Sequence, residues 1–149
     1  HNDSKIVSTI KSRCQKINFS LVDVEEIKKV SNSDVANFSM GRPGMAIEMI
    51  ENKEELDIVR KEFEYVMRFS DIGINERLKL AEKMSLDEAK TIKRLEFWMW
   101  IIRLKVLRDK NNYGFFSFET IEKIEKSLEM IKKTNANMRL VIENLFLEI

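Results

Sequence analysis

The stretch that decides the fold is Phe118–Lys132, which reads FETIEKIEKSLEMIK. Its apolar residues recur every three or four positions, and charged residues fill most of the positions between them. This spacing places one apolar stripe along a helix and predicts an amphipathic α-helix that packs on a core. The stripe consists of Phe118, Ile121, Ile124, Leu128 and Ile131.

The same periodicity predicts about five helices from Lys53 onward. Ser85–Glu88 resembles a capping box, a serine followed three residues later by glutamate, and is expected to open the helix that contains Trp98. Asn111–Gly114 predicts a loop, and Thr134–Asn135 interrupts the pattern before a final helix. The apolar positions that define the other helices are Leu56, Val59, Phe63, Val66 and Met67, then Leu78, Leu80 and Ala81, then Leu140, Val141, Leu145 and Ile149.

Three shorter helices are predicted before residue 52. Asp23 is a good N-cap residue for the first, and Ser33–Asp34 can start the second. The Gly41–Gly44 segment breaks the pattern, and Pro43 suits the first turn of the third helix. We place a boundary near Glu51–Lys53, where the helices become longer.

The composition excludes several protein classes. The chain has 149 residues with four Gly and one Pro, whereas average usage would give roughly 18 of the two together. So few turn residues argue against sandwiches and barrels. The formal net charge of +1 lacks the basic excess of a free-standing nucleic-acid binder. The single cysteine excludes a disulfide framework and a cysteine-rich zinc site, and it suits a reducing cytoplasm.

The residue inventory also limits the chemistry. The only histidine is His1, which is either native or the remnant of an expression tag. A Ser-His-Asp triad and a multi-histidine metal site are therefore not expected, and neither GxGxxG nor GxxxxGK[ST] occurs. The carboxylates alternate with lysines as on a solvated helix face. The most apolar run, Phe97–Ile102, is six residues long, far below the roughly 18 that would suggest a membrane span.

One segment does not fit a purely helical chain. In Gln15–Phe19, Ile17 and Phe19 continue from Cys14 as a short apolar stretch typical of one strand. A single strand leaves its backbone groups unpaired, and no later segment is a candidate partner. The segment either packs irregularly or belongs to a sheet whose other strands precede this chain.

Four segments, in this order along the chain, resemble one protein family. Ser4–Gln15, SKIVSTIKSRCQ, is similar to SKLLPTIRSRCQ of bacterial clamp-loader ATPases, with their SRC motif at Ser12–Cys14. Asp23–Ile27 resembles the start of that family's lid domain. Gly41–Glu48, GRPGMAIE, resembles GRPGKALEL, and Asn135–Glu143, NANMRLVIE, resembles NANPRLALE, both from delta-prime subunits. The chain is thus similar to the DNA polymerase III clamp-loader family, and to its delta-prime group in particular.

The resemblance implies an all-α C-terminal part of such a subunit, with a short remnant of the AAA+ ATPase core. Residues 1–19 would end that core, 20–52 would form a three-helix lid, and 53–149 a helical collar. Gln15–Phe19 would then be an edge strand of a parallel sheet. The Walker motifs and any zinc module would lie upstream, so we expect no enzyme activity and no cofactor in this chain. The full-length protein would be a subunit of the DNA polymerase III holoenzyme.

The expected partners follow from the same resemblance. The collar would contact the other clamp-loader subunits, tau/gamma and delta, in the bacterial cytoplasm, without a membrane. The sliding clamp and primer–template DNA would be partners only of the whole complex in DNA replication. Asn135, Asn137 and Arg139 are expected to fix the last inter-helix turn. Candidates for subunit contacts, of which at least two must be core, are Phe97, Trp98, Trp100, Phe115 and Phe116.

Arg13 is the expected functional residue. In the family the SRC arginine reaches across a subunit interface to ATP held by a neighbour, as an arginine finger. Ser12 and Cys14 are expected to hold the turn beneath it. A sensor arginine opens the last lid helix of the ATP-hydrolysing subunits, but here its position falls on Gly44. Arg42 is two residues early and is interpreted as a solvated residue before the helix.

Two other interpretations stay open. One is a motor ATPase subunit of the tau/gamma type, which would require a P-loop upstream; the glycine at position 44 argues against it. The other is a free-standing helical interaction module that shares these motifs by accident. That module would be a compact fold in which Ser4–Phe19 packs in place.

Overall fold

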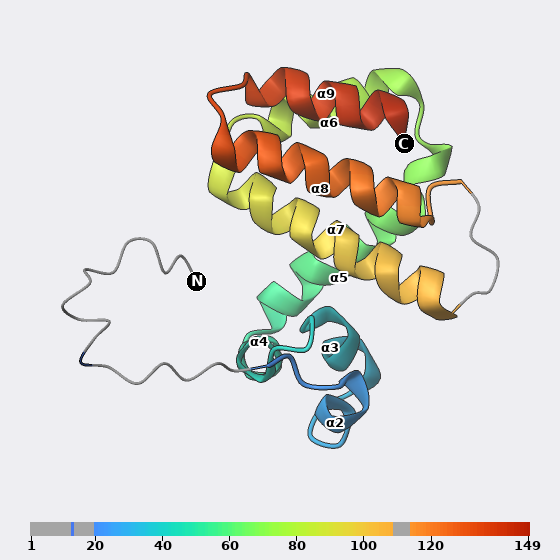
Figure 1. The fold of residues 1–149 in the computed structure, drawn as a ribbon. Coiled ribbons are helices and arrows are strands. Elements are labelled where there is room, and N and C mark those ends of the chain that lie inside the picture. The colour runs from blue at the N-terminus through green and yellow to red at the C-terminus, as the bar shows by residue number, and fades with distance from the viewer. Residues whose placement is uncertain (1–12, 14–19, 109–113) are drawn as a thin grey trace.

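All the regular secondary structure in the described part of the chain is helical. The computed structural model describes residue 13, residues 20–108 and residues 114–149 (Figure 1). The predicted all-α fold class is therefore confirmed for these residues. The strand predicted at Gln15–Phe19 lies outside the described residues.

Among the described residues, three short helices come first, as predicted. They are α2 (Val24–Lys28), α3 (Ser33–Phe38) and α4 (Pro43–Glu51). The Asp23 carboxylate caps α2 by accepting from the backbone N–H of Glu25 at 2.9 Å. Asn32, one residue before the predicted start, caps α3 by accepting from the N–H of Val35 at 2.9 Å. Pro43 is the first residue of α4, where its missing N–H costs no helical hydrogen bond.

The longer helices begin directly after α4. Asn52 ends α4 through its N–H and caps α5 through its side chain, which accepts from Glu54 N at 3.1 Å. Asn52 is therefore the junction between α4 and α5, and the domain boundary near Glu51–Lys53 stays a prediction. The elements that follow are α5 (Lys53–Met67), the 3₁₀ turn η2 (Phe69–Asp71), α6 (Ile74–Met84), α7 (Glu88–Arg108), α8 (Phe118–Lys133) and α9 (Met138–Glu148).

The capping box predicted at Ser85–Glu88 is wrong. Ser85 ends α6, and its hydroxyl donates to the carbonyl of Glu82 at 2.7 Å. Asp87 caps α7 instead, because its carboxylate accepts from the N–H of Lys90 at 3.0 Å. The serine hydroxyl bonds a carbonyl of the helix that ends, so α7 begins at Glu88 rather than at Leu86, the residue after Ser85.

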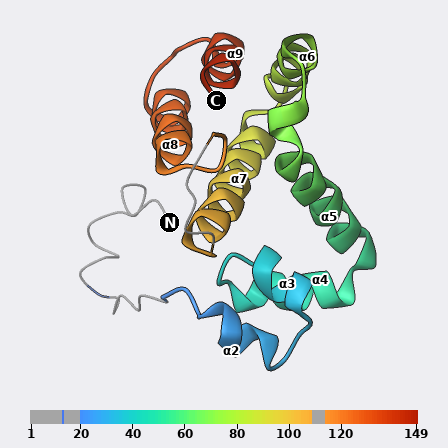
Figure 2. The same ribbon diagram turned by 90° about the vertical axis from the view of Figure 1, so that its right-hand side faces the viewer.

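The core lies around α7. Figure 2 shows α7 between α5 and α8, and α9 packs against both α6 and α8. Trp98 of α7 is fully buried. Its ring centroid lies 4.9 Å from that of Phe69 and 5.6 Å from that of Phe146. Offset aromatic pairs at these distances add to the stabilisation from burial. The short helices sit at one end of α5 and α7 (Figure 1).

Burial shows which of the five aromatic candidates for subunit contacts are core residues, of which at least two were expected. Phe97, Trp98 and Phe115 are core residues, with 8, 0 and 6% of their surface exposed. Trp100 and Phe116 are half-buried against the same core. A subunit contact needs exposed apolar surface, so the first three residues cannot provide it.

Candidate functional site

Arg13 is exposed, and it is the one member of the SRC motif among the described residues. Exposure leaves its guanidinium accessible to a ligand or a partner. Ser12 and Cys14, which were expected to support it, lie outside the described residues.

The sequence resemblance places the family's sensor-arginine position at Gly44. Gly44 is the second residue of α4, it is exposed, and no atom lies within 4 Å of the position that a Cβ would occupy. Arg42 is exposed and precedes the helix, as predicted, and its guanidinium Nη1 lies 4.0 Å from the Met45 sulfur.

Polar contacts join the short helices to the long ones. The indole N–H of Trp100 donates to the carbonyl of Asn37 at 2.8 Å, and Arg108 donates to the Asn37 side chain at 3.0 Å. Arg60 of α5 binds Asp34 of α3, with 2.9 Å between Nη2 and Oδ2. These bonds fix α3 against both α5 and α7. In the sequence, Trp100 is the residue that could have indicated its contact with α3. A tryptophan that is half-buried needs a hydrogen-bond acceptor for its indole N–H.

A second polar group lies between α5 and α7. The Glu62 carboxylate accepts from Arg94 Nε at 2.6 Å and also from the indole N–H of Trp98. The Arg94 guanidinium lies 5.6 Å from the ring centroid of Tyr65. Burial raises the pKa of the Tyr65 hydroxyl above its ordinary value, with Arg94 opposing the shift. The cluster satisfies the one polar atom of the buried Trp98 side chain and so has a structural role.

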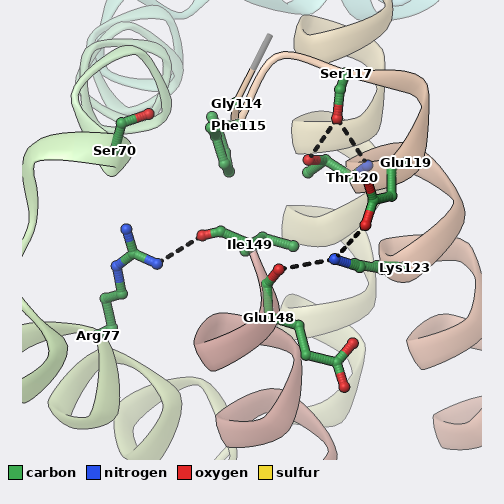
Figure 3. Close-up of a pocket in the computed structure, with 10 residues that line it drawn as sticks. All are labelled: Ser70, Arg77, Gly114, Phe115, Ser117, Glu119, Thr120, Lys123, Glu148 and Ile149. Carbon is green, nitrogen blue, oxygen red and sulfur yellow. Dashed lines mark hydrogen bonds and ion pairs between the residues drawn. The ribbon is translucent and has the colours of Figure 1, made fainter.

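A hollow of about 560 Å³ opens at the end of α9 (Figure 3). Arg77 lines it and donates to the carbonyls of Phe146 at 3.0 Å and Ile149 at 2.7 Å. The same guanidinium lies 4.6 Å from the ring centroid of Phe69. Arg77 thus satisfies carbonyls at the end of α9 that have no partner within the helix.

Lys123, Ser117 and Thr120, which also line this hollow, are engaged in structural bonds as well. Lys123 contacts the Glu119 carboxylate at 2.8 Å and donates to the carbonyl of Glu148 at 2.8 Å (Figure 3). Its ammonium group lowers the pKa of Glu119, so this carboxylate stays ionised. Ser117 caps α8 by accepting from the N–H of Thr120 at 3.2 Å.

This arrangement offers no base beside a nucleophile. The hydroxyl oxygens of Ser117 and Thr120 lie 3.1 Å apart at the start of α8, where Ser117 caps the helix. Among the residues that the structure describes, no group of three or more His, Cys, Asp or Glu could hold a metal ion. The bonds from Arg77 and Lys123 to carbonyls at the end of α9 join α6, α8 and α9 at this hollow.

Exposed aliphatic residues replace the aromatic ones as candidate contacts. Ile47 and Ile50 lie one turn apart on α4, with 56 and 51% of their surface exposed. Leu140 and Leu147 lie two turns apart on α9 and are exposed to a similar degree. Of these four residues the apolar spacing singled out Leu140 for the last helix, and spacing alone does not show which apolar positions are exposed.

Asn137 and Arg139 hold the last inter-helix turn, between α8 and α9, as predicted. Asn137 caps α9 by accepting from the N–H of Arg139 at 3.0 Å. Arg139 contacts Glu143 at 2.7 Å and Glu82 of α6 at 3.3 Å. Asn135 is exposed beside them.

A functional proposal for this chain rests on the family resemblance of its sequence. Within residues 20–108 and 114–149, no helix combines the length and apolar character that a membrane crossing requires. The chain matches none of the protein-family models, curated proteins or solved structures with which it was compared.

Proposed function

We propose that this chain supplies the lid and collar of a delta-prime-type subunit of the bacterial DNA polymerase III clamp loader. The observation that carries the proposal is the order of four motif-like segments: Ser4–Gln15, Asp23–Ile27, Gly41–Glu48 and Asn135–Glu143. One short motif would carry little weight, but these four span both ends of the chain.

The helix lengths support the assignment of domains. Residues 20–52 contain three short helices and would be the lid; residues 53–149 contain five longer helices and would be the collar. Residues 1–19 would be the end of the AAA+ core. In this proposal the collar assembles subunits, and the exposed Leu140 and Leu147 of α9 are its candidate contacts. Ile47 and Ile50 of α4 would be a candidate contact of the lid.

Arg13 would act in trans. A guanidinium is planar and permanently charged, so it can stabilise the charge that develops on a transferring phosphoryl group. The ATP would be held by a neighbouring subunit, and this chain would bring only the arginine. The exposure of Arg13 supports this role, and Gly44 at the sensor position favours a non-hydrolysing subunit over a motor.

The test uses the full-length subunit in a reconstituted clamp loader. Arg13→Ala should leave assembly unchanged and lower ATP turnover at the neighbouring site that it faces by on the order of 10³-fold, because a finger acts on the transition state. Arg42→Ala is the matched control, since Arg42 is also exposed. Wild-type turnover in the Arg13→Ala complex, or an equal loss in both complexes, would refute the assignment.

The same reconstitution separates the other interpretations. A tau/gamma-type motor would hydrolyse ATP through its own site, and Arg13→Ala would not abolish that activity. A free-standing interaction module would fail to join the complex at all. The sliding clamp and primer–template DNA are expected to bind the whole complex rather than the isolated subunit.

A further inference from the structure

A groove of about 320 Å³ lies where the short helices meet α7 and α8. Its apolar lining consists of Leu21 and Met40, Met99 and Trp100 of α7, and Ile121 of α8. Leu21 at the groove keeps 61% of its surface exposed, and Met40, Met99 and Trp100 are half-buried. The groove therefore offers accessible apolar surface that three separate parts of the chain build together.

A strained turn carries Met40 into this groove. Met40 and Gly41 have positive φ, 53° and 69°, and the N–H of Arg42 donates to the carbonyl of Ser39 at 2.9 Å across the turn. Within residues 20–108 and 114–149, Met40 is the one residue with a side chain that adopts positive φ. Such strain persists where the surrounding structure holds it, and it gathers at binding sites. Met40 is therefore a second indication of a site, independent of the groove itself.

Hydrogen bonds fix the groove on both sides without a partner. On one side, the N–H of Val22 donates to the carbonyl of Gly41 at 2.8 Å and keeps residues 21–22 against the turn. On the other side, the indole N–H of Trp100 donates to the carbonyl of Asn37 at 2.8 Å. A preformed groove loses little conformational freedom when it binds a partner.

The unpaired charge at the groove is positive. Arg42 and Arg103 both line it and are exposed, and in the described part of the chain neither guanidinium contacts a carboxylate. Of the two acidic residues there, Glu96 binds Lys132 at 2.8 Å and Glu125 is exposed. Two unpaired positive groups thus stand against one negative group. A partner that complements this charge carries carboxylates.

The α7 side of the groove has the spacing that a helix would match. Met99, Trp100 and Arg103 follow Glu96 by three, four and seven residues, so all four lie on one face of α7. Seven residues of helix rise about 10 Å. Amphipathic helices bind grooves of this kind through apolar residues at the same spacing.

We propose that this groove docks a short amphipathic helix of a partner protein, with apolar side chains against Met40, Met99 and Trp100 and carboxylates toward Arg42 and Arg103. One helix in a groove buries far less surface than permanent subunits share, so the partner is a transient one and not a clamp-loader subunit. ATP turnover by the loader does not require it. The inference goes beyond the proposed function and does not depend on Arg13.

The probe is a synthetic peptide of about 15 residues, since shorter helices are marginal in water. It has leucine at positions i, i+3, i+4 and i+7 and glutamate at most other positions, and a matched peptide has lysine in place of glutamate. NMR of methionine methyl groups in the full chain reports the site. The glutamate peptide should shift the signals of Met40 and Met99 and leave that of Met84, a core residue of α6, unchanged. The lysine peptide should bind at least about tenfold more weakly.

Arg103→Glu tests the charge at the groove. It should weaken binding of the glutamate peptide by about tenfold or more, and raised salt should weaken binding to wild type. Arg68→Glu is the matched control, because Arg68 is also exposed and does not line the groove. This control should change the affinity by less than about threefold.

Three results would overturn the proposal. The first is unchanged Met40 and Met99 signals at about 1 mM glutamate peptide. The second is equal binding of the two peptides, or an equal loss in Arg103→Glu and Arg68→Glu. The third is a shift of the same signals with protein concentration alone, which would assign the groove to a second copy of the chain. ATP enters none of these measurements, so their failure leaves the arginine finger to its own test.

Discussion

The indole N–H of Trp100 donates to the backbone carbonyl of Asn37 across 2.8 Å, and this bond joins helix α7 to helix α3. The two residues are 63 positions apart in the sequence. The short helices are thus held by a bond whose donor lies on the longest helix of the described residues.

Trp100→Phe should lower the free energy of unfolding by about 1–3 kcal/mol. The variant keeps an aromatic ring but leaves the Asn37 carbonyl without its donor. Urea denaturation of the whole chain measures the change. Phe116→Leu is a control at another half-buried aromatic position, where no hydrogen bond is removed; a loss in Trp100→Phe no larger than in this control would contradict the prediction.

Arg77→Lys should destabilise the end of α9, although it keeps the positive charge. The guanidinium donates in several directions at once, to the carbonyls of Ile72, Phe146 and Ile149. A lysine ammonium cannot reproduce that planar fork. We expect a loss of about 2 kcal/mol in thermal or urea unfolding.

The control for Arg77 is Arg42→Lys. Arg42 is exposed, so its substitution should change stability by less than about 0.5 kcal/mol. Equal stability of the two variants would show that the Arg77 bonds contribute nothing net.

Asp87→Asn should remove part of the pH dependence of stability. The hydrogen bond from the Lys90 N–H lowers the pKa of Asp87 below its ordinary 3.8. A depressed pKa in the folded state means that the carboxylate stabilises the fold above its unfolded pKa, and that this contribution is lost as pH falls through the folded value. The stability of wild type should therefore fall more steeply below about pH 4 than that of Asp87→Asn. Parallel curves in urea titrations from pH 6 to 2 would refute this.

Asn137→Ala should lower stability by about 1 kcal/mol, because the side chain caps α9 through the N–H groups of Arg139 and Leu140. Asn135→Ala, two residues earlier and also exposed, should have little effect. Circular dichroism during thermal unfolding measures both. A larger loss at Asn135 than at Asn137 would contradict the assigned cap.

The helices could be predicted from the sequence because their apolar spacing is local information. The stripe from Ile121 to Ile131 is buried on α8 as expected. The start of α7 could not be predicted in the same way, because Ser85 and Asp87 are both good caps. Which one acts depends on where α6 ends.

The sequence pattern could not predict which aromatic side chains are fully buried or which polar groups pair across long stretches of the chain. Trp98 and Trp100 are equally aromatic, yet Trp98 is fully buried and Trp100 is only half-buried at the contact with α3. Arg77 looks like a surface residue within its own helix, and its role depends on carbonyls about 70 positions away. The candidate finger, Arg13, rested on the motif alone, and the structure adds its exposure.

Asn52 terminates α4 with its backbone and starts α5 with its side chain. The two helical units therefore share a residue in place of a linker, and the chain path between them has a single pair of backbone dihedral angles to vary. A force applied to the short helices would therefore tend to rotate α5, because no flexible linker lies between α4 and α5.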